Sequence, residues 1–212
     1  MILLIGSEGS QGKRYQSILK YLGKQFICKD WRLPSRIDEK TIEKNVTGII
    51  IATPTITHMN LLEKYLLLKK PIFVEKPISK NITEVRELER LIKATKGDVR
   101  MAFQYKYVVT NIKSQGYSEY DYFRHGNDGL VWDCLQIIGL ARGMIGLKEQ
   151  SPIWKCTING EKLRAGELMD AAYVMDIASW LNGEKQDFKE VLDVHEKVHV
   201  FEDQLALGFK RD

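Results

Sequence analysis

Two opposite charges and a proline stand together at the end of a short apolar run. Residues 71–78 read PIFVEKPI, so Glu75, Lys76 and Pro77 follow three apolar residues directly. Such a run is typical of a buried strand, and a proline ends the hydrogen-bonding ladder. In open parallel sheets, ligands bind outside the carboxyl ends of the strands. The carboxylate and the ammonium are therefore candidates for a ligand site, although a surface ion pair at a strand-to-loop corner gives the same pattern.

A second motif could bind the phosphates of a dinucleotide. Residues 6–12 read GSEGSQG, a GxxGxxG pattern that follows an apolar run and precedes a helical one. Glycines there allow a tight turn and a close approach of pyrophosphate, while free amides at the helix start face the anion. The spacing differs from the commoner GxGxxG by one residue, and a glycine-rich turn without a ligand is the alternative. The candidate cofactor-binding residues of this loop are Gly6, Ser7, Gly9, Ser10, Gln11 and Gly12.

Two charged residues after the expected second strand bear on the choice of dinucleotide. Asp30 stands about where an acidic residue would hold the adenosine ribose, which favours NAD over NADP. Arg32 could instead accept a 2′-phosphate, so NADP stays an alternative. A solvated loop carboxylate is the other interpretation of Asp30.

The first half of the chain alternates strands and helices, as the elements that would position these motifs. We expect apolar strands at 1–5, 25–29, 47–52, 72–74 and 99–103, and helices after the glycine loop, at 57–69 and at 82–95, with a possible short helix at 38–44. Apolar runs without alternation are typical of strands buried on both faces. The pattern predicts an α/β fold, a Rossmann doubly wound parallel sheet over residues 1–103.

The composition of the second half differs, which predicts a small α+β domain over residues 104–212. We expect a helix at 130–146, a strand at 152–158 followed by an Asn159-Gly160 hairpin turn, and a helix at 166–183. The segment 193–205 fits either a strand or a frayed helix.

Bulk composition excludes several classes of function. The 212 residues carry a net charge of only +4, which does not argue for nucleic acid. The three cysteines lack metal-ligand spacing, and the pair His195 and His199 lies in a strand-like alternation, so no metal is expected. No apolar run is long enough for a membrane span, and Met1 leads straight into a strand. We expect a cytoplasmic protein with a small-molecule substrate.

Residues 49–79, taken with the glycine loop, resemble the Gfo/Idh/MocA family, named after glucose–fructose oxidoreductase, inositol 2-dehydrogenase and a rhizopine-catabolism protein. In that family a strand ends in a Thr-Pro-x-x-x-His turn, a helix follows, and the next strand ends in Glu-Lys-Pro. Thr53-Pro54, His58 and the 75–77 triplet stand here in that order. The resemblance covers about the first half of the chain.

The resemblance implies an NAD(P)-dependent oxidoreductase acting on a sugar, cyclitol or sugar-nucleotide hydroxyl or carbonyl. Thr53 and Pro54 would line the cofactor, with His58 close to it. Glu75 would contact the nicotinamide side and Lys76 would face the substrate. An ammonium beside a carbinol oxygen can stabilise the developing alkoxide or polarise the carbonyl.

The chain departs from the family in its second half, which is why we expect a shortened member. Family members are usually longer and carry an Asp-x-x-x-His helix with histidine as acid/base. Asp133 fits the aspartate of that helix but Ile137 stands at the histidine; alternatively Asp176 fits the helix end and Tyr173 stands at the histidine. We favour the first and take Asp133 as the second candidate catalytic residue, although a helix first-turn carboxylate is an equal alternative.

The departures leave other functions open. One alternative is a catalytically reduced NAD(P)-binding sensor or accessory protein that keeps the fold, and another is a non-redox enzyme that uses tightly held NAD. We also expect a homo-oligomer, because an exposed sheet edge favours pairing.

Overall fold

The computed structural model describes residues 1–30, 40, 44–104, 106–107, 120–121, 157–158, 161–162 and 165–206. Arg32 and Asp133 lie outside these residues, as do the expected helix at 130–146 and most of the one at 38–44. The chain divides into two compact units. The first unit combines Met1–Ala102 with Ile177–Leu192, and the second combines Phe103–Asp176 with Asp193–Asp212.

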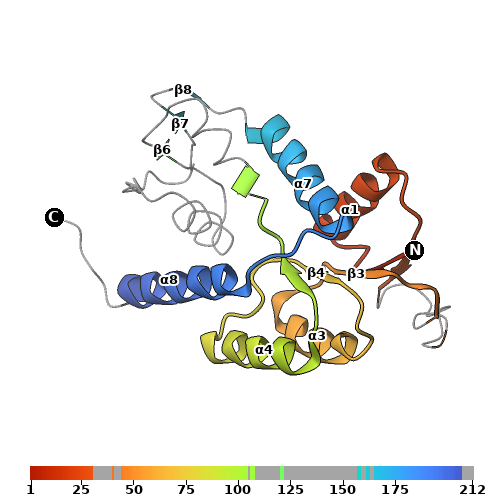
Figure 1. Cartoon of the computed structure of the whole chain (residues 1–212). Helices are drawn as coiled ribbons and strands as arrows, with labels where there is room; N and C mark the ends of the chain where they lie inside the picture. Colours follow the sequence, from red (N-terminus) through yellow and green to blue (C-terminus); the bar gives the residue numbers. More distant parts are fainter. Residues whose placement is uncertain are drawn as a thin grey trace. The chain divides into compact units, whose positions relative to one another are not determined.

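The first unit is built on a five-stranded parallel sheet, which confirms the predicted fold class (Figure 1). Its strands are β1 (Ile2–Ile5), β2 (Phe26–Lys29), β3 (Gly48–Ile51), β4 (Ile72–Val74) and β5 (Val99–Met101), in the order β2-β1-β3-β4-β5. From β1 the chain enters β2 on one side, and β3 then pairs with β1 on the other side. The order reverses between β1 and β3, and ligands of open α/β sheets bind at such a switch point.

Three helices connect these strands. They are α1 (Ser10–Tyr21), α3 (His58–Leu66) and α4 (Ile82–Thr95). The helix expected at 57–69 is shorter, because a 3-10 turn, η1 (Thr55–Thr57), precedes it and Lys69 adopts a φ of 52° beyond its end. α4 has the expected bounds: the side chain of Asn81 accepts a hydrogen bond from Thr83 N at its start, and the left-handed Lys96 ends it.

Phe73 of β4 shows how the two faces of the sheet are covered. Its ring meets the ring of Tyr15 edge-on, and its centroid lies 5.7 Å from the ring centroid of Tyr15 and 5.7 Å from that of Trp180. α1 and the 177–181 stretch therefore pack on one face. Side chains alternate along a strand, which directs Ile72 and Val74 to the opposite face. There α3 and α4 lie side by side (Figure 1).

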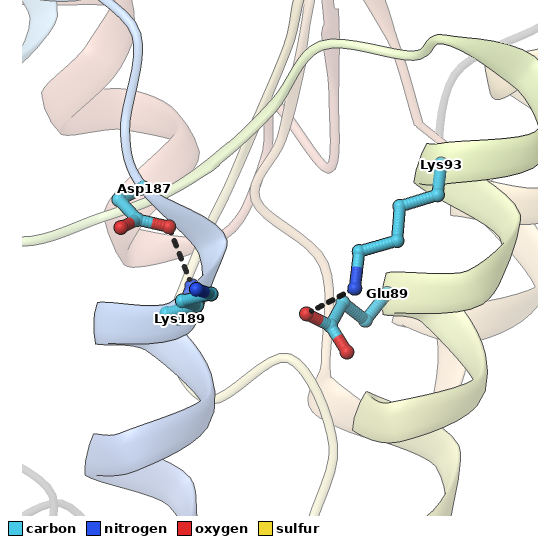
Figure 2. Close-up of polar contacts among 4 residues, drawn as sticks. All are labelled: Glu89, Lys93, Asp187 and Lys189. Atoms are coloured by element: carbon cyan, nitrogen blue, oxygen red, sulfur yellow. Dashed lines mark hydrogen bonds and ion pairs between the residues drawn. The ribbon is translucent and has the colours of Figure 1, made fainter.

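Two further helices follow, α7 (Ala165–Leu181) and α8 (Phe188–Ala206). In the first unit, Arg100 of β5 donates to Ser179 Oγ at 2.9 Å and to the carbonyl of Glu184 at 3.2 Å. Figure 2 shows the start of α8, where the Asp187 side chain accepts from Lys189 N at 3.0 Å, and the Lys93–Glu89 ion pair on α4, at 2.8 Å.

Among the helices of the described residues, none has the length and apolar character that a membrane span requires.

The second unit contains a small antiparallel sheet, ordered β6-β7-β8, from Tyr120–Asp121, Thr157–Ile158 and Glu161–Lys162. β7 and β8 pair in antiparallel register, Ile158 with Glu161, as the predicted hairpin requires. Of the two alternatives for the 193–205 segment, the helix is confirmed and the strand is wrong, because the segment lies within α8. Val191, Val194 and His195 are buried there at helical spacing.

Candidate functional site

The glycine loop is packed tightly against the carboxyl end of β3. Gly6 has a φ of 82°, and a Cβ at this position would lie 2.5 Å from the carbonyl oxygen of Ala52. A Cβ on Gly12 would lie 2.1 Å from the carbonyl oxygen of Gly6. Both glycines are therefore required by the fold itself, since backbone atoms occupy the space that a side chain would need.

Gly9 differs from these two glycines. Its backbone is extended, with φ −73° and ψ 166°, and a Cβ there would make only ordinary contacts, 3.5 Å from the Gly6 oxygen at the nearest. Neither conformation nor packing demands glycine at this position. The close approach of a phosphate group would require glycine at this position.

The start of α1 offers hydrogen-bond donors that the described chain does not use. Lys13 N donates to the carbonyl of Gly9 at 2.9 Å, so the amides of Ser10, Gln11 and Gly12 precede the first intrahelical bond. Within the described ranges these three amides have no acceptor, and the first turn carries no acidic side chain. Three outward amides at a helix start fit the pyrophosphate of a dinucleotide.

Ser7 contributes to the loop through its backbone. Its side chain is fully buried, and its carbonyl accepts from Gln16 Nε2 at 2.9 Å. The loop is therefore fixed from the α1 side, and Ser7 does not present its hydroxyl to solvent.

Asp30 lies beside the glycine loop, just past β2. One of its carboxylate oxygens accepts from the amide of Glu8 at 3.0 Å. Asp30 is thus next to the phosphate-binding candidates, where a ribose partner must lie.

Burial, and to a lesser degree the carboxylates of Glu8 and Asp30, raise the pKa of the nearby Cys28 thiol, so a reactive thiolate is disfavoured at neutral pH.

The imidazole of His58 joins the ends of β3 and β4. Its Nε2 lies 2.8 Å from the carbonyl oxygen of Thr53 and its Nδ1 lies 2.8 Å from that of Pro77. The ring is 1% exposed. The Thr57 hydroxyl, 2.7 Å from Thr53 Oγ1, further fixes the turn after β3. His58 therefore joins the turn after β3 to the turn after β4.

Burial lowers the pKa of His58, against the weaker opposing influence of the two carbonyls and of the Glu75 carboxylate. A neutral imidazole carries a single N–H and can donate to only one of the two carbonyls at a time. Protonation would complete both bonds, but burial disfavours the charge.

Glu75 and Lys76 are held at the carboxyl end of β4. The Glu75 carboxylate, 5% exposed, accepts hydrogen bonds from the Tyr15 hydroxyl and, at 3.1 Å, from the backbone amide of Lys76. The Lys76 side chain is half-buried. Pro77 on its far side is bound by His58, and Ile78 is fully buried. The residues that flank Lys76 are thus fixed on both sides.

A continuous set of contacts brings most of the predicted residues to one edge of the sheet. The loop packs on Ala52 and Thr53, His58 joins Thr53 to Pro77, and the Lys76 segment follows β4. Tyr15 was not among the site residues predicted from the sequence. The signal available was a tyrosine on a stripe that faces a strand ending in a carboxylate, and it was too general to assign.

A polar cluster in the second unit involves the helix that the sequence analysis ranked second. In α7, Asp176 accepts from the amide of Phe103 at 2.6 Å, and the Tyr173 hydroxyl accepts from Gln104 Nε2 at 3.0 Å. Asp176 and Tyr173 are both buried. The role proposed for Asp133 stays a prediction.

The paired histidines of α8 do not form a metal centre with other ligands in the described residues. His195 is buried and His199 is exposed. No group of three or more potential ligands occurs in the part of the chain that the structure describes.

Comparison with protein families places the first half of the chain. Residues 11–103 match the Gfo/Idh/MocA model, described as an oxidoreductase family with an NAD-binding Rossmann fold. Inositol 2-dehydrogenase of Rhizobium meliloti is 31% identical over 71 residues, which are 34% of this chain and 22% of that protein. The match therefore spans less than a quarter of that relative.

Solved structures share the fold over nearly the whole chain. A Gfo/Idh/MocA family oxidoreductase from Vibrio cholerae aligns with a TM-score of 0.73 at 14% identity, covering 97% of this chain and 98% of that one. The WlbA dehydrogenase from Thermus thermophilus, crystallised with NAD and UDP-GlcNAcA, aligns with a TM-score of 0.65 at 14% identity, covering 94% of each chain. At identities this low, the structural similarity shows a common fold and nothing further.

Proposed function

Because residues 11–103 belong to the Gfo/Idh/MocA oxidoreductase family, we propose that this protein binds NAD and oxidises or reduces a sugar, cyclitol or sugar nucleotide. One observation carries the proposal. Three amides at the start of α1, which have no acceptor within the described residues, follow β1, and Lys76 follows β4 at the carboxyl ends of the same sheet, with β3 between them. A dinucleotide-dependent reaction on a hydroxyl group requires an anion site for the cofactor and a cationic side chain near the substrate, at the carboxyl ends of the strands.

The cofactor-binding role falls to residues at three strand ends. The amides of Ser10, Gln11 and Gly12 would bind the pyrophosphate, and Gly9 leaves room for it. The Asp30 carboxylate, beside the loop, would bind the ribose hydroxyls and disfavour the 2′-phosphate of NADP. The turn at Thr53 and Pro54 would line the nicotinamide half. NAD, when bound, supplies the acceptor or donor of the hydride.

Lys76 is the residue that we assign to the substrate. Its ammonium would lie next to the carbinol or carbonyl oxygen and stabilise negative charge on it as the carbon–hydrogen bond breaks or forms. Glu75 holds the Lys76 amide, which limits the freedom of the backbone that carries the ammonium. Preorganisation of this kind lowers the reorganisation needed in the transition state.

The substrate class rests on what similar proteins act on. The related Rhizobium meliloti protein is an inositol 2-dehydrogenase, and the WlbA dehydrogenase was crystallised with a sugar nucleotide. Both ligands are polyhydroxylated rings with a secondary carbinol. We propose that this chain accepts a substrate of that chemistry.

Calorimetric titration with NAD⁺, NADH, NADP⁺ and NADPH tests cofactor binding directly. We expect NAD⁺ or NADH to bind with a micromolar dissociation constant and the 2′-phosphorylated forms more weakly. Turnover is then measured on a panel of inositols and UDP-sugars, with Lys76→Met as the test variant and Lys80→Met, at an exposed position four residues on, as its control. Absence of binding to all four dinucleotides would refute the proposal.

The second candidate function is a protein that binds NAD without turnover. It is favoured by the lack of a histidine at either candidate position, Ile137 in the preferred match and Tyr173 in the alternative one. The buried hydroxyl of Tyr173 accepts from Gln104 Nε2. A neutral hydroxyl is a weaker proton acceptor than an imidazole. This function predicts cofactor binding with no activity on any member of the panel, and a rate that depends on Lys76 would exclude it.

A further inference from the structure

Tyr15 brings a buried hydroxyl to the end of β4. It lies in α1, its side chain is fully buried, and its ring packs edge-on against Phe73 at an interplanar angle of 76°. The ring alone would account for its place in the apolar stripe of the helix. Packing does not require the hydroxyl, which donates a hydrogen bond to the carboxylate of Glu75.

The Glu75 carboxylate is shared between a helix and a backbone amide. One oxygen accepts from Tyr15 and the other accepts from the amide of Lys76 at 3.1 Å. A carboxylate that is 5% exposed must be hydrogen-bonded to remain in the interior. Of the other titratable groups, His58 is close enough for its protonation to depend on the charge of Glu75. Removing the Tyr15 hydroxyl would leave one Glu75 oxygen without its donor and the carboxylate free to turn away from Lys76.

The helix that carries Tyr15 is the one whose first turn offers its amides to an anion. Ser10 and Tyr15 belong to the same twelve-residue helix, so their separation is fixed by helical geometry. We propose that Tyr15 is a positioning residue, which holds Glu75 against the Lys76 amide and thereby fixes the lysine relative to the helix that binds the cofactor's pyrophosphate. The inference rests on the proposed function for the roles of the lysine and the loop.

Tyr15→Phe tests this inference because it removes the hydroxyl and keeps the ring that packs on Phe73. Tyr65→Phe is a matched control: Tyr65 is 2% exposed, lies in α3, and its hydroxyl contacts Lys29 Nζ at 3.3 Å. Hydrogen–deuterium exchange at the Lys76 amide, followed by NMR, reports the Glu75 bond. We expect exchange about tenfold faster in Tyr15→Phe, the size of effect typical of a lost bond to a charged group, and unchanged exchange in Tyr65→Phe.

Steady-state kinetics supply the second measurement. Tyr15→Phe should lower kcat about tenfold while the dissociation constant of NAD⁺ changes less than about twofold, since the phosphate-binding amides are untouched. A purely structural role would instead lower the melting temperature without changing the Lys76 amide. If Tyr15→Phe does not fold, Glu75→Gln tests the same pair of bonds, because its single amide oxygen cannot accept from both Tyr15 and the Lys76 amide, and exchange at Lys76 should accelerate if the Tyr15 hydroxyl competes for it.

The two levels of inference fail in different ways. Unchanged exchange at the Lys76 amide in both variants would overturn the role of Tyr15, whatever the activity. Full turnover by Lys76→Met would overturn the proposed function, while faster exchange in Tyr15→Phe would still establish that the tyrosine positions the residue.

Discussion

The two borders of the site are built in opposite ways. The glycine loop is positioned by the absence of side chains: Gly6 and Gly12 let backbone atoms approach where a Cβ would lie 2.5 and 2.1 Å from carbonyl oxygens. The end of β4 is positioned by side chains. Tyr15 of α1 binds Glu75, and His58 of α3 binds the carbonyl of Pro77.

The difference predicts how each border responds to mutation. A loop held by close packing fails when volume is added, and the effect is large because backbone cannot move aside. A segment held by buried hydrogen bonds fails when a donor or acceptor is removed, and each lost bond has a moderate effect. The loop is thus sensitive to size and the strand end is sensitive to chemistry.

Gly12→Ala should have the largest effect. We expect a loss of about 3 kcal/mol in the free energy of unfolding, measured by urea denaturation, because the new methyl group would meet the Gly6 carbonyl and the Ser7 backbone. Gly9→Ala is the control, with a cost of less than about 1 kcal/mol and a weakening of NAD⁺ binding of at least about tenfold. Equal stability losses at the two glycines would break the distinction drawn between them.

Glu75→Gln should come next, at about 1–3 kcal/mol of stability, since an amide cannot accept from both Tyr15 and the Lys76 amide with the same geometry. Denaturant unfolding measures the loss. Glu87→Gln, whose side chain is 52% exposed, should change stability by less than about 0.5 kcal/mol. A loss at Glu75 as small as this control would mean that the strand end does not depend on its buried polar contacts.

His58 should make stability depend on pH in a defined direction. Burial lowers its pKa below 6.5, so between that lowered pKa and 6.5 the unfolded chain binds more protons than the folded one. Stability is therefore full above pH 6.5 and is lost as the pH falls, by at most about 1.4 kcal/mol per pH unit for one proton.

His58→Asn removes the titrating group, and denaturation at a series of pH values should show a shallower acid slope than in the unmodified protein. Identical slopes in both proteins would show that His58 titrates alike in the folded and unfolded states. The comparison also separates the His58 contacts from the loop, because glycine substitutions leave this pH dependence in place.

The smallest effect should come from the surface. Lys93→Ala breaks the ion pair with Glu89, but the lysine side chain is 68% exposed and the pair joins neighbouring turns of α4. We expect a change of less than about 0.5 kcal/mol in thermal or chemical denaturation. A larger value would mean that polar contacts outside the site contribute as much as those at the end of β4, which would remove the contrast.

The sequence predicted the first unit closely because its signals are local. Apolar runs and the glycine loop each depend on a few adjacent residues, and β1, β3 and α4 lie within two residues of their expected bounds. The same holds for the motif residues, since Thr53, His58 and the Glu75–Pro77 triplet follow strand ends that the pattern locates.

The remaining features depend on contacts between distant residues, which a pattern does not encode. Arg100 reaches Ser179 across 79 positions and Tyr15 reaches Glu75 across 60. The tail stayed undecided between a strand and a helix for a related reason: VHEKVHV alternates like a strand, and the Asp187 cap and the buried Val191 and Val194 show that it continues a helix. Arg32 and Asp133 stay predictions.

Gln186 has a consequence for association with other chains. Its side-chain oxygen accepts from the amide of Met101, at 2.8 Å, on the β5 border of the described sheet. A strand from another molecule would need that amide and would have to displace Gln186 to reach it. Intermolecular β-pairing is therefore discouraged at Met101.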